Sequence, residues 1–505
     1  MEISPETHRS RWWALIVLLL PVLIISMDAT VLGFAVPALS ESLEPSSSQL
    51  LWIIDIYSFV LAALLVTMGV LGDRVGRRKL LIIGAAGFSA ASLLAGFSTS
   101  PEMLIASRAL LGVAGATLMP STLSLIRNIF QDARERQTAI ALWATAFAVG
   151  AAIGPIVGGV LLEHYWWGSV FIIGVPFTVS LVLLAPLLVP ESKDPNPGRF
   201  DLVSAVLSMS TTLPVVYAIK MFAEHGWNVE APVALAVGVV SGVLFVRRQL
   251  RSKSPMIDVT LFRVPRFRMA VSGNLIACFG FAGTMFIVTQ YLQLVVGMSP
   301  LRAGLQMLPG VAAAIVATIL SPAAARRFGP FAVIAAGLGM AAVGFGAMSQ
   351  ITTDTVPLIT VAMVLLNAGL GMAMTVAIDG ILASIPPKRA GAGAAVSETA
   401  NELGIALGTA ILGSVINAVY RTNMDDLTGI PGEAMHYARE TLGAAVVTSE
   451  YLPEPLAGLL RDGASSAFVD GAQAAALVAG AALVAAAVWA AFSARGGVAP
   501  TEAAD

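Results

Sequence analysis

Charged side chains are scarce in this chain of 505 residues. Aspartate, glutamate, lysine and arginine make up only 12% of the residues, whereas hydrophobic residues make up 57%. A soluble domain carries about 25% charged residues, because water has to solvate its surface. The scarcity therefore excludes a water-soluble globular protein and predicts a chain surrounded by lipid. A net charge of only −2 also gives no reason to expect a nucleic-acid partner.

Residues that commonly act as metal ligands or nucleophiles are equally rare. The chain has one cysteine, Cys278, which excludes a disulfide framework within the chain. Its four histidines all lie at or beyond the ends of apolar segments. The sequence contains no G-x-x-x-x-G-K-[ST] phosphate-binding loop, so it offers no site for ATP hydrolysis. We therefore expect neither an enzyme nor a bound metal or organic cofactor.

Long apolar runs make up most of the chain instead. A helix needs about 20 mostly apolar residues to cross the hydrocarbon core of a bilayer. The run that follows Arg9 and Arg11 lacks a small-residue cleavage site, so we interpret it as a retained span rather than a signal peptide. The sequence predicts fourteen spans, at residues 12–37, 50–71, 80–98, 103–126, 138–162, 167–189, 202–222, 231–247, 269–296, 303–322, 330–349, 356–380, 391–419 and 467–493.

The distribution of basic residues supports this count, because lysine and arginine accumulate in the cytoplasmic loops of membrane proteins. With the N-terminus inside, 23 of the 29 basic residues fall in the inside segments, five fall outside, and Arg108 lies within a span. A missed helix would reverse every later loop and destroy this asymmetry. We therefore predict an all-α, multi-pass protein of the inner (cytoplasmic) membrane with both termini in the cytoplasm.

The spans divide into two bundles and an inserted pair. We expect an N-terminal six-helix bundle at 1–196, two inserted helices at 197–262 and the first five helices of a C-terminal bundle at 263–423. An acidic extracellular loop or hairpin at 424–464, with short helices at 434–447 and 454–461, precedes the last helix and tail at 465–505. This loop is either a solvated connection or a vestibule that attracts cations.

The loop between spans two and three reads GVLGDRVGRRK over residues 69–79. It resembles the G-x-L-a-D-r-x-G-r-k motif of the major facilitator superfamily. The resemblance implies an ion-pair latch that keeps the cytoplasmic side closed. A merely basic inside loop would explain the arginines but not the acid and the second glycine. A degenerate counterpart, RRFG at 326–329, follows span ten, as related halves predict. The gating residues implied are Gly69, Asp73, Arg74, Gly76 and Arg77.

Span five carries the pattern Gly150-x-x-x-Gly154-Pro155-x-x-Gly158-Gly159. Small residues four apart let helices approach closely, and the Gly-Pro step weakens the helix backbone locally. Ordinary close packing would explain the small residues alone. The full pattern resembles the signature of exporters that exchange drugs for protons, and uptake members of the superfamily usually lack it.

Spans one and thirteen indicate which branch of the superfamily the chain resembles. The segment Met27-Asp28-Ala29-Thr30-Val31 with Pro37, and the segment SETANELG at 397–404, are similar to the fourteen-helix drug:proton antiporters, which include QacA-, SmvA- and LfrA-type quaternary-ammonium exporters. The LfrA type is the most similar. This resemblance implies proton-driven alternating access and export of quaternary ammonium compounds, dyes and cationic antibiotics such as fluoroquinolones. Transport of one specific metabolite by the same fold is the alternative.

Ionisable groups inside spans are costly and are functional candidates by default. Helical rise places Asp28, Asp55 and Arg108 at one depth in the first bundle. We expect Arg108 to hold one carboxylate ionised while the other takes a proton. Asp55 could instead serve only to neutralise Arg108. Asp379 and Asp470 lie near span ends and are expected to be solvated.

Span thirteen adds Glu398 and Glu402, which lie four apart and therefore on one helix face, with Asn401 between them. Burial and mutual repulsion favour protonation of such a pair near neutral pH. We expect a cation and a proton to compete for these carboxylates, which gives them both proton-coupling and substrate-binding roles. Polar packing around an aqueous cavity, without a coupling role, is the alternative.

An excess of buried acidic side chains attracts cations. The faces of aromatic rings and the polarisable side chains of methionine suit a bulky cation whose charge is delocalised. The partners expected are therefore small lipophilic cations, protons and the bilayer, with the chain acting as a monomer. Each aromatic could equally face lipid or the protein core. The substrate-binding candidates beside Glu398, Asn401 and Glu402 are Trp52, Tyr57, Trp143, Phe147, Phe286, Gln290 and Tyr291, with Phe59, Phe281, Met27, Met285, Met307 and Asn367 as further choices.

Overall fold

The computed structural model describes residues 5–43, 45, 47–193, 201–225, 229–252, 255, 257–386, 390–439 and 441–495. Within these ranges every regular element is a helix, and no strand is present. Thirteen helices are long and apolar enough to cross a membrane, and a shorter apolar stretch lies at Leu202–Val215. The prediction of an all-α, multi-pass membrane protein is confirmed, whereas the count of fourteen spans stays a prediction.

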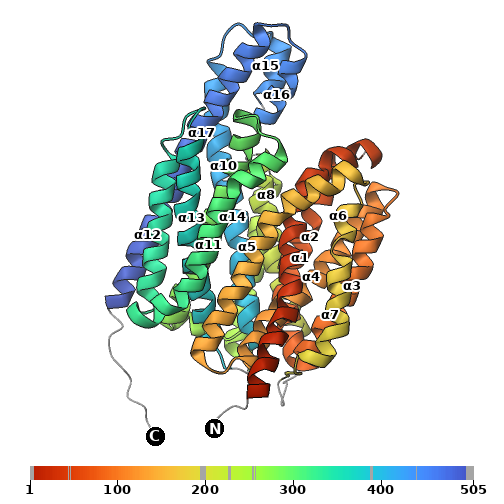
Figure 1. The fold of residues 1–505 in the computed structure, drawn as a ribbon, viewed down its shortest axis with the longest axis vertical. Coiled ribbons are helices and arrows are strands. Elements are labelled where there is room, and N and C mark those ends of the chain that lie inside the picture. The colour runs from red at the N-terminus through yellow and green to blue at the C-terminus, as the bar shows by residue number, and fades with distance from the viewer. Residues whose placement is uncertain are drawn as a thin grey trace.

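The first bundle consists of the elements drawn in red to yellow (Figure 1). Its buried apolar side chains form one large cluster that runs from Ala14 to Val189 along the chain and also includes Ile378, Leu382 and Ala394. The predicted sixth span is broken into two helices around Gly174. The helices are α1 (Pro5–Leu43), α2 (Ser47–Val75), α3 (Arg77–Gly96), α4 (Pro101–Ile129), α5 (Ala133–His164), α6 (Ser169–Ile172) and α7 (Val175–Leu188).

The second bundle is built around a separate cluster of buried apolar side chains, which runs from Met269 to Ala490. Its first helix ends in a π-helical turn, η2 (Tyr291–Val295). The membrane-crossing helices are α10 (Pro265–Gln290), α11 (Pro300–Phe328), α12 (Pro330–Met348), α13 (Val356–Ala383), α14 (Ala390–Asp425) and α17 (Leu456–Arg495). The predicted domain boundaries stay predictions.

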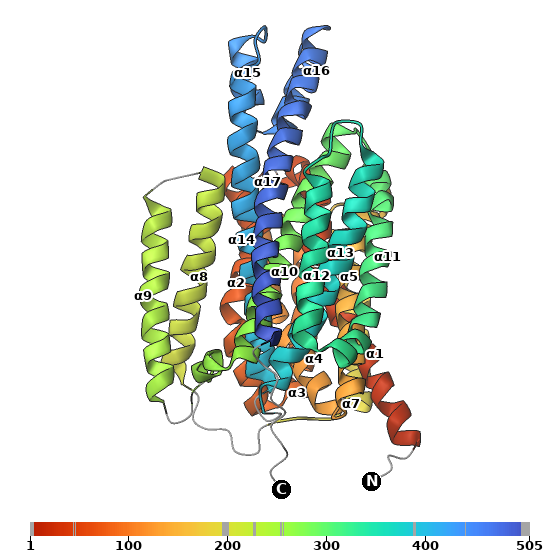
Figure 2. The same ribbon diagram turned by 90° about the vertical axis from the view of Figure 1, so that its left-hand side faces the viewer.

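Two helices, α8 (Leu202–His225) and α9 (Glu230–Arg251), form a hairpin beside the bundles (Figure 2). α8 packs against α2 and α14, whereas α9 packs mainly against α8 and leaves most of its valines exposed. Arg248 on α9 makes two 2.9 Å hydrogen bonds to Asp201, at the start of α8. These bonds hold the pKa of the Asp201 carboxyl well below its usual range. A short 3₁₀ helix, η1 (Val259–Arg263), precedes α10.

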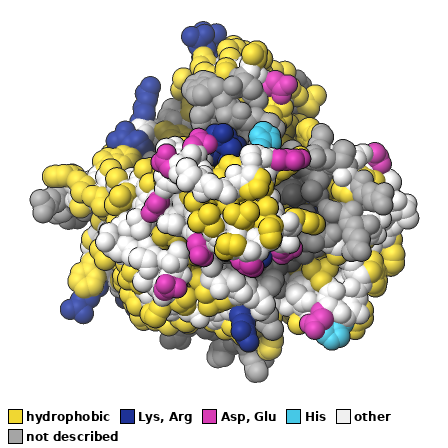
Figure 3. Space-filling model, turned by 90° about the horizontal axis from the view of Figure 1, so that it is seen from above, with side chains coloured by type: hydrophobic (Ala, Val, Ile, Leu, Met, Phe, Trp, Pro, Cys, Tyr) yellow, Lys and Arg dark blue, Asp and Glu magenta, His cyan; other side chains and the backbone are white. Residues whose placement is uncertain are grey.

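The segment before the last helix forms a helical protrusion (Figure 1). It contains α15 (Gly432–Ala438) and α16 (Leu442–Glu450), between the extended ends of α14 and α17. The expected single helix at 434–447 is wrong, because α15 ends and α16 begins inside it. The expected helix at 454–461 is the first part of α17. Seen from this side, the acidic side chains are dispersed rather than gathered into one patch (Figure 3).

The beginning of α1 and the end of α17 lie at the face opposite the protrusion (Figure 1). We call this face the terminal face. Charged side chains from both bundles meet there, as described below.

Three glycines of α5 allow it to lie directly against α1. A Cβ at Gly150 would overlap the backbone oxygen of Leu23, and one at Gly154 would overlap the Thr30 side chain. A Cβ at Gly158 would lie 2.6 Å from the nearest methyl carbon of Val31. By contrast, a Cβ at Gly159 would meet no atom within 4 Å. Bare backbone is therefore required at three of the four glycines of the predicted antiporter motif; the side chain of the fifth motif residue, Pro155, lies outside the described residues.

This packing predicts different outcomes for two alanine substitutions in the same helix. Gly150→Ala should lower the free energy of unfolding by about 1–3 kcal/mol, because the methyl group presses on the α1 backbone. Gly159→Ala should leave stability unchanged or slightly higher, because alanine favours helix and the space is open. Thermal unfolding of the two purified variants measures this difference. Equal melting temperatures would contradict the packing account.

Candidate functional site

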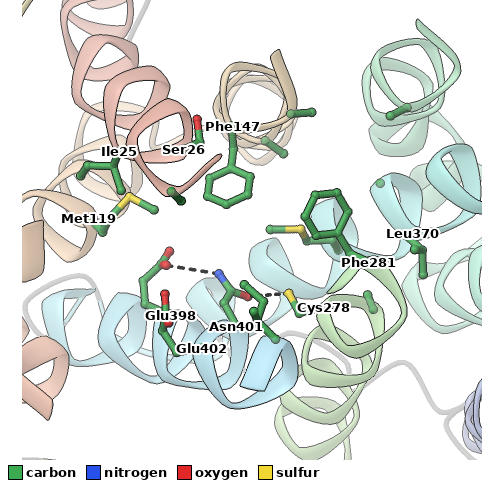
Figure 4. Close-up of a pocket in the computed structure, with 18 of the residues that line it drawn as sticks. Ile25, Ser26, Met119, Phe147, Cys278, Phe281, Leu370, Glu398, Asn401 and Glu402 are labelled. Carbon is green, nitrogen blue, oxygen red and sulfur yellow. Dashed lines mark hydrogen bonds between the residues drawn. The ribbon is translucent and has the colours of Figure 1, made fainter. Parts of the chain in front are cut away.

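A cavity of about 250 Å³ lies between the two bundles. α1, α2, α4 and α5 contribute its wall from the first bundle, and α10, α11, α13 and α14 contribute from the second (Figure 4). Most of the wall is apolar, with Met119, Phe147, Phe281, Leu370 and Met374 among its larger side chains. Uncharged polar groups come from Ser26, Tyr57, Ser58, Thr318, Asn367 and Asn401.

Two carboxylates enter this apolar space from α14. Glu398 and Glu402 both line the cavity, and Glu398 is only 2% exposed. The Asn401 amide donates to Glu398 Oε2 at 3.2 Å, while Glu398 Oε1 has no hydrogen-bond partner among the described residues. None of the described residues that line the cavity is a lysine or an arginine. The cavity therefore combines two acidic side chains with a wall that is mostly apolar.

A buried ion pair lies behind one wall of the cavity. The Arg108 guanidinium donates to Asp28 Oδ2 at 2.8 Å, and both side chains are buried. Arg108 also donates to the Ile53 carbonyl at 3.2 Å and lies 4.7 Å from the centre of the Tyr57 ring, which itself lines the cavity. The structure thus brings Asp28 and Arg108 together, as the sequence suggests. Asp55 lies in α2, but its side chain is outside the described residues.

The aromatic residues predicted to bind substrate lie at different distances from the cavity. Tyr57 and Phe147 line the cavity. Trp143 lies one layer behind, because its ring stacks on Phe147 at 6.3 Å and its indole donates to Thr122 at 3.1 Å.

Four other candidates are not among the residues that line the cavity. Trp52 is 41% exposed and packs its ring edge-on against Phe59. Phe286 packs beside Gly413 of α14, within the second apolar cluster. Gln290 ends α10, and Tyr291 is buried in the following turn, where its hydroxyl donates to the Thr352 carbonyl at 2.6 Å.

The motif after span two links the bundles at the terminal face. Arg77 donates to Asp73 Oδ1 at 2.6 and 2.8 Å. The other oxygen of Asp73 accepts the backbone N–H of Ala392 at 3.2 Å, in the first turn of α14. An acid at a helix N-terminus interacts favourably with the helix dipole. Asp73 therefore connects the end of α2 to the start of a helix in the opposite bundle.

Glu191 and Ser192, which sequence reasoning missed, complete this motif. Glu191 accepts the backbone N–H groups of Arg78 and Lys79 at 3.0 and 3.1 Å and so caps α3. Ser192 accepts from Arg77 at 2.6 Å. Gly76 adopts φ 117°, a conformation that favours glycine, and a Cβ there would lie 2.9 Å from the Glu191 carboxyl. The remaining motif residues, Gly69 and Arg74, lie in α2.

A second link joins the bundles at the same face. Asp379, in the last turn of α13, accepts from Arg136 at 2.8 Å and from Gln137 at 3.1 Å, both in the first turn of α5. Arg326, in the degenerate second motif, donates to Gln137 at 3.4 Å. The expectation that Asp379 is solvated is wrong, because the opposite bundle buries it to 8% exposure. Asp470 is exposed, as expected, and accepts from Asn423.

Comparison with known proteins agrees with this architecture. Residues 18–409 match the sequence model of the family described as Major Facilitator Superfamily. The multidrug efflux pump LfrA of Mycolicibacterium smegmatis is 50% identical over 96% of this chain and 97% of its own length. The methyl viologen resistance protein SmvA of Salmonella typhimurium is 34% identical over 91% of this chain and 93% of its own length.

A solved structure supports the fold alone. The human organic anion transporter MFSD10 (TETRAN) aligns with a TM-score of 0.65 at 13% identity, covering 96% of this chain and 100% of that chain. The family match spans most of the chain, and two relatives exceed 30% identity over nearly all of it. The resemblance inferred from the sequence motifs is thereby confirmed, and the chain belongs to the Major Facilitator Superfamily, in the branch that contains the drug-resistance proteins LfrA and SmvA.

Proposed function

We propose that this protein is a proton-coupled multidrug efflux antiporter. It exports lipophilic cations, such as quaternary ammonium compounds, dyes and cationic antibiotics of the fluoroquinolone kind, across the inner membrane. The names of the relatives LfrA and SmvA support drug efflux. The observation that carries the proposal is the pair Glu398 and Glu402 in a mostly apolar cavity, whose described wall contains no basic side chain.

The chemistry of this cavity selects for positive charge. A buried carboxylate that stays ionised needs a positive partner, and in its absence the group takes up a proton. A lipophilic cation supplies that partner while its apolar body contacts Phe147, Phe281 and the methionines. A cation and a proton can therefore replace each other at Glu398, and Glu402 on the same helix face adds a second acidic group to the site.

The two links at the terminal face supply the other half of the mechanism. With the terminal face in the cytoplasm, the Asp73 and Asp379 contacts close the cavity from the inside. Protons arriving from the outside then neutralise the carboxylates and release the cation. Breaking both links opens the cavity to the cytoplasm, where the protons leave and the next cation binds. The protein acts as a monomer in this cycle, because one chain provides both bundles.

Transport of one specific metabolite is the second candidate function. The uncharged polar groups around the cavity, such as Asn367 and Thr318, could orient a defined polar substrate. Flexible methionine and phenylalanine side chains suit varied ligands better, because they adapt to different shapes. Accumulation of several unrelated cationic dyes in cells, with and without an uncoupler, distinguishes the two functions. Broad, uncoupler-sensitive efflux supports the drug exporter.

Removing both cavity carboxylates should remove the preference for cations. We expect Glu398→Gln with Glu402→Gln to weaken ethidium binding at least 10-fold, since charge-assisted contacts contribute about 1.5–3 kcal/mol each. The remaining binding should no longer depend on pH between 5 and 9. Fluorescence titration of the purified protein measures both effects. Glu433→Gln makes the same chemical change on the protrusion and is the control; unchanged, pH-dependent binding in the double variant would refute the role of the pair.

Asp28 should be required because of its ion pair with Arg108. Asp28→Asn leaves the buried Arg108 charge uncompensated behind the cavity wall, where it repels a bound cation. We expect proton-driven dye export from everted vesicles to fall at least 10-fold, with the folded protein still eluting as one species. Asp470→Asn, at an exposed site, is the matched control. Full export by Asp28→Asn would remove this residue from the mechanism.

The links at the terminal face can be tested with the single native cysteine, because Cys278 lines the cavity. Asp73→Asn and Asp379→Asn should each increase labelling of Cys278 by a charged thiol reagent applied to inside-out vesicles. Loss of a charge-assisted contact worth about 1.5–3 kcal/mol shifts a two-state equilibrium roughly 10-fold or more. Asp425→Asn, which removes an exposed ion pair on the protrusion, should not change labelling. Equal labelling in all variants would argue against both links.

A further inference from the structure

A buried chain of amides connects α10 to the cavity carboxylate Glu398. Asn274, on α10, is completely buried. Its Nδ2 donates to Asn401 Oδ1 at 2.7 Å and to the Ser397 carbonyl at 3.1 Å. Asn401 Nδ2 in turn donates to Glu398 Oε2 at 3.2 Å (Figure 4).

The backbone decides the direction of this chain. A carbonyl oxygen can only accept a hydrogen bond, so the Ser397 carbonyl requires the NH₂ end of Asn274 on its side. That NH₂ group also faces Asn401, which must then present its oxygen to Asn274. The NH₂ end of Asn401 is consequently left to face Glu398. One backbone group thus fixes the orientation of two side-chain amides. Without such a group, the positions of the oxygen and nitrogen of a side-chain amide are ambiguous.

The orientation has a cost that points to a function. Asn274 Oδ1 is buried and has no hydrogen-bond partner among the described residues. An unsatisfied buried polar atom in a native structure calls for an explanation. Here the explanation is that the other end of the same amide is needed to hold Asn401.

We propose that Asn274 is a positioning residue that, through Asn401, confines the exchangeable proton of Glu398 to Oε1, the oxygen that the Asn401 amide does not contact. The inference rests on the proposed function and adds a residue that does not line the cavity. Oε2 accepts the Asn401 N–H, which disfavours a proton on that oxygen, whereas Oε1 has no partner among the described residues. A proton on Oε1 removes the negative charge that would attract a cation, so the proton and the cation exclude each other.

Other titratable groups around the cavity do not replace this role. Glu402 lies on the same helix face, Cys278 comes from α10 and Tyr57 from α2. The Cys278 thiol is directed at Asn401 Oδ1, 3.3 Å away, and so strengthens the same amide orientation. The Asp28–Arg108 pair lies behind Tyr57. The described cavity residues of α1, α4, α5, α11 and α13 carry no titratable side chain.

Loss of Asn274 should free Asn401 to turn over. Its oxygen could then accept a hydrogen bond from protonated Glu398, which moves the proton to Oε2 and stabilises the neutral form. A cation would have to displace a more tightly held proton. Cation binding should therefore require a higher pH, while binding to the fully ionised site at alkaline pH should be nearly unchanged.

The experiment measures tetraphenylphosphonium binding to the purified full-length protein from pH 5 to pH 10. We expect Asn274→Leu to raise the pH of half-maximal binding by roughly one unit, the effect of about one hydrogen bond, and to leave the affinity at pH 10 within about threefold of the original. Thr284→Val is the matched control, because Thr284 is a buried residue of α10 whose hydroxyl donates within its own helix, to the Gly280 carbonyl. Should Asn274→Leu fail to fold, Asn274→Ala breaks the same chain without added bulk.

The outcomes separate this inference from the proposed function. If the unaltered protein binds the cation without any pH dependence, the proposed function fails. If it shows the pH dependence but the Asn274 variants keep the same midpoint, only the positioning role fails. An affinity loss of equal size at every pH would mean that Asn274 has a purely structural role, which also overturns the inference.

Discussion

The structure depends on one electrostatic constraint, which is that Glu398 and Glu402 lie inside a membrane-embedded cavity with no basic side chain in its described wall. A carboxylate at this depth is stable only when it is protonated or when a positive ligand lies beside it. The chain could have neutralised the pair with arginine, as it does for Asp28 with Arg108. For Glu398, whose Oε1 has no hydrogen-bond partner among the described residues, the absence of arginine from the described wall would leave the carboxyl responsive to both protons and cations under the proposed function. The proposed exchange follows from this difference between the two acidic sites.

The rest of the fold positions these groups and, under the proposed function, controls access to them. Glycines of α5 bring that helix against α1, the helix that carries Asp28. At the terminal face, the two bundles exchange similar contacts. The end of α2 meets the start of α14 through Asp73, and the end of α13 meets the start of α5 through Asp379. In the second half the acid comes from a neighbouring helix, because Arg326 occupies the position that corresponds to Asp73.

Local patterns in the sequence were sufficient to predict much of the fold and part of the candidate site. Run length and charge predicted the helical membrane fold, the spacing of four placed Glu398 and Glu402 on one face, and depth placed Asp28 near Arg108. The direction in which each side chain faces was harder to predict, because a helix that is apolar on all sides has no polar stripe that indicates its orientation. Trp52 and Tyr291 therefore looked as suitable for binding substrate as Phe147, although of these three only Phe147 lines the cavity. The Arg136–Asp379 contact joins residues 243 apart in sequence, and no local pattern marks such a pair.

The amide chain from Asn274 was hidden for the same reason, since an isolated asparagine in an apolar helix carries no sign of its partner. The chain bears on the proposed competition between a cation and a proton for the same carboxylates. Calorimetric titration of a lipophilic cation in buffers of different ionisation enthalpy counts the protons released per cation bound. The account predicts release near neutral pH that declines to zero once both carboxylates are ionised. Tight binding with no proton release at any pH would contradict it.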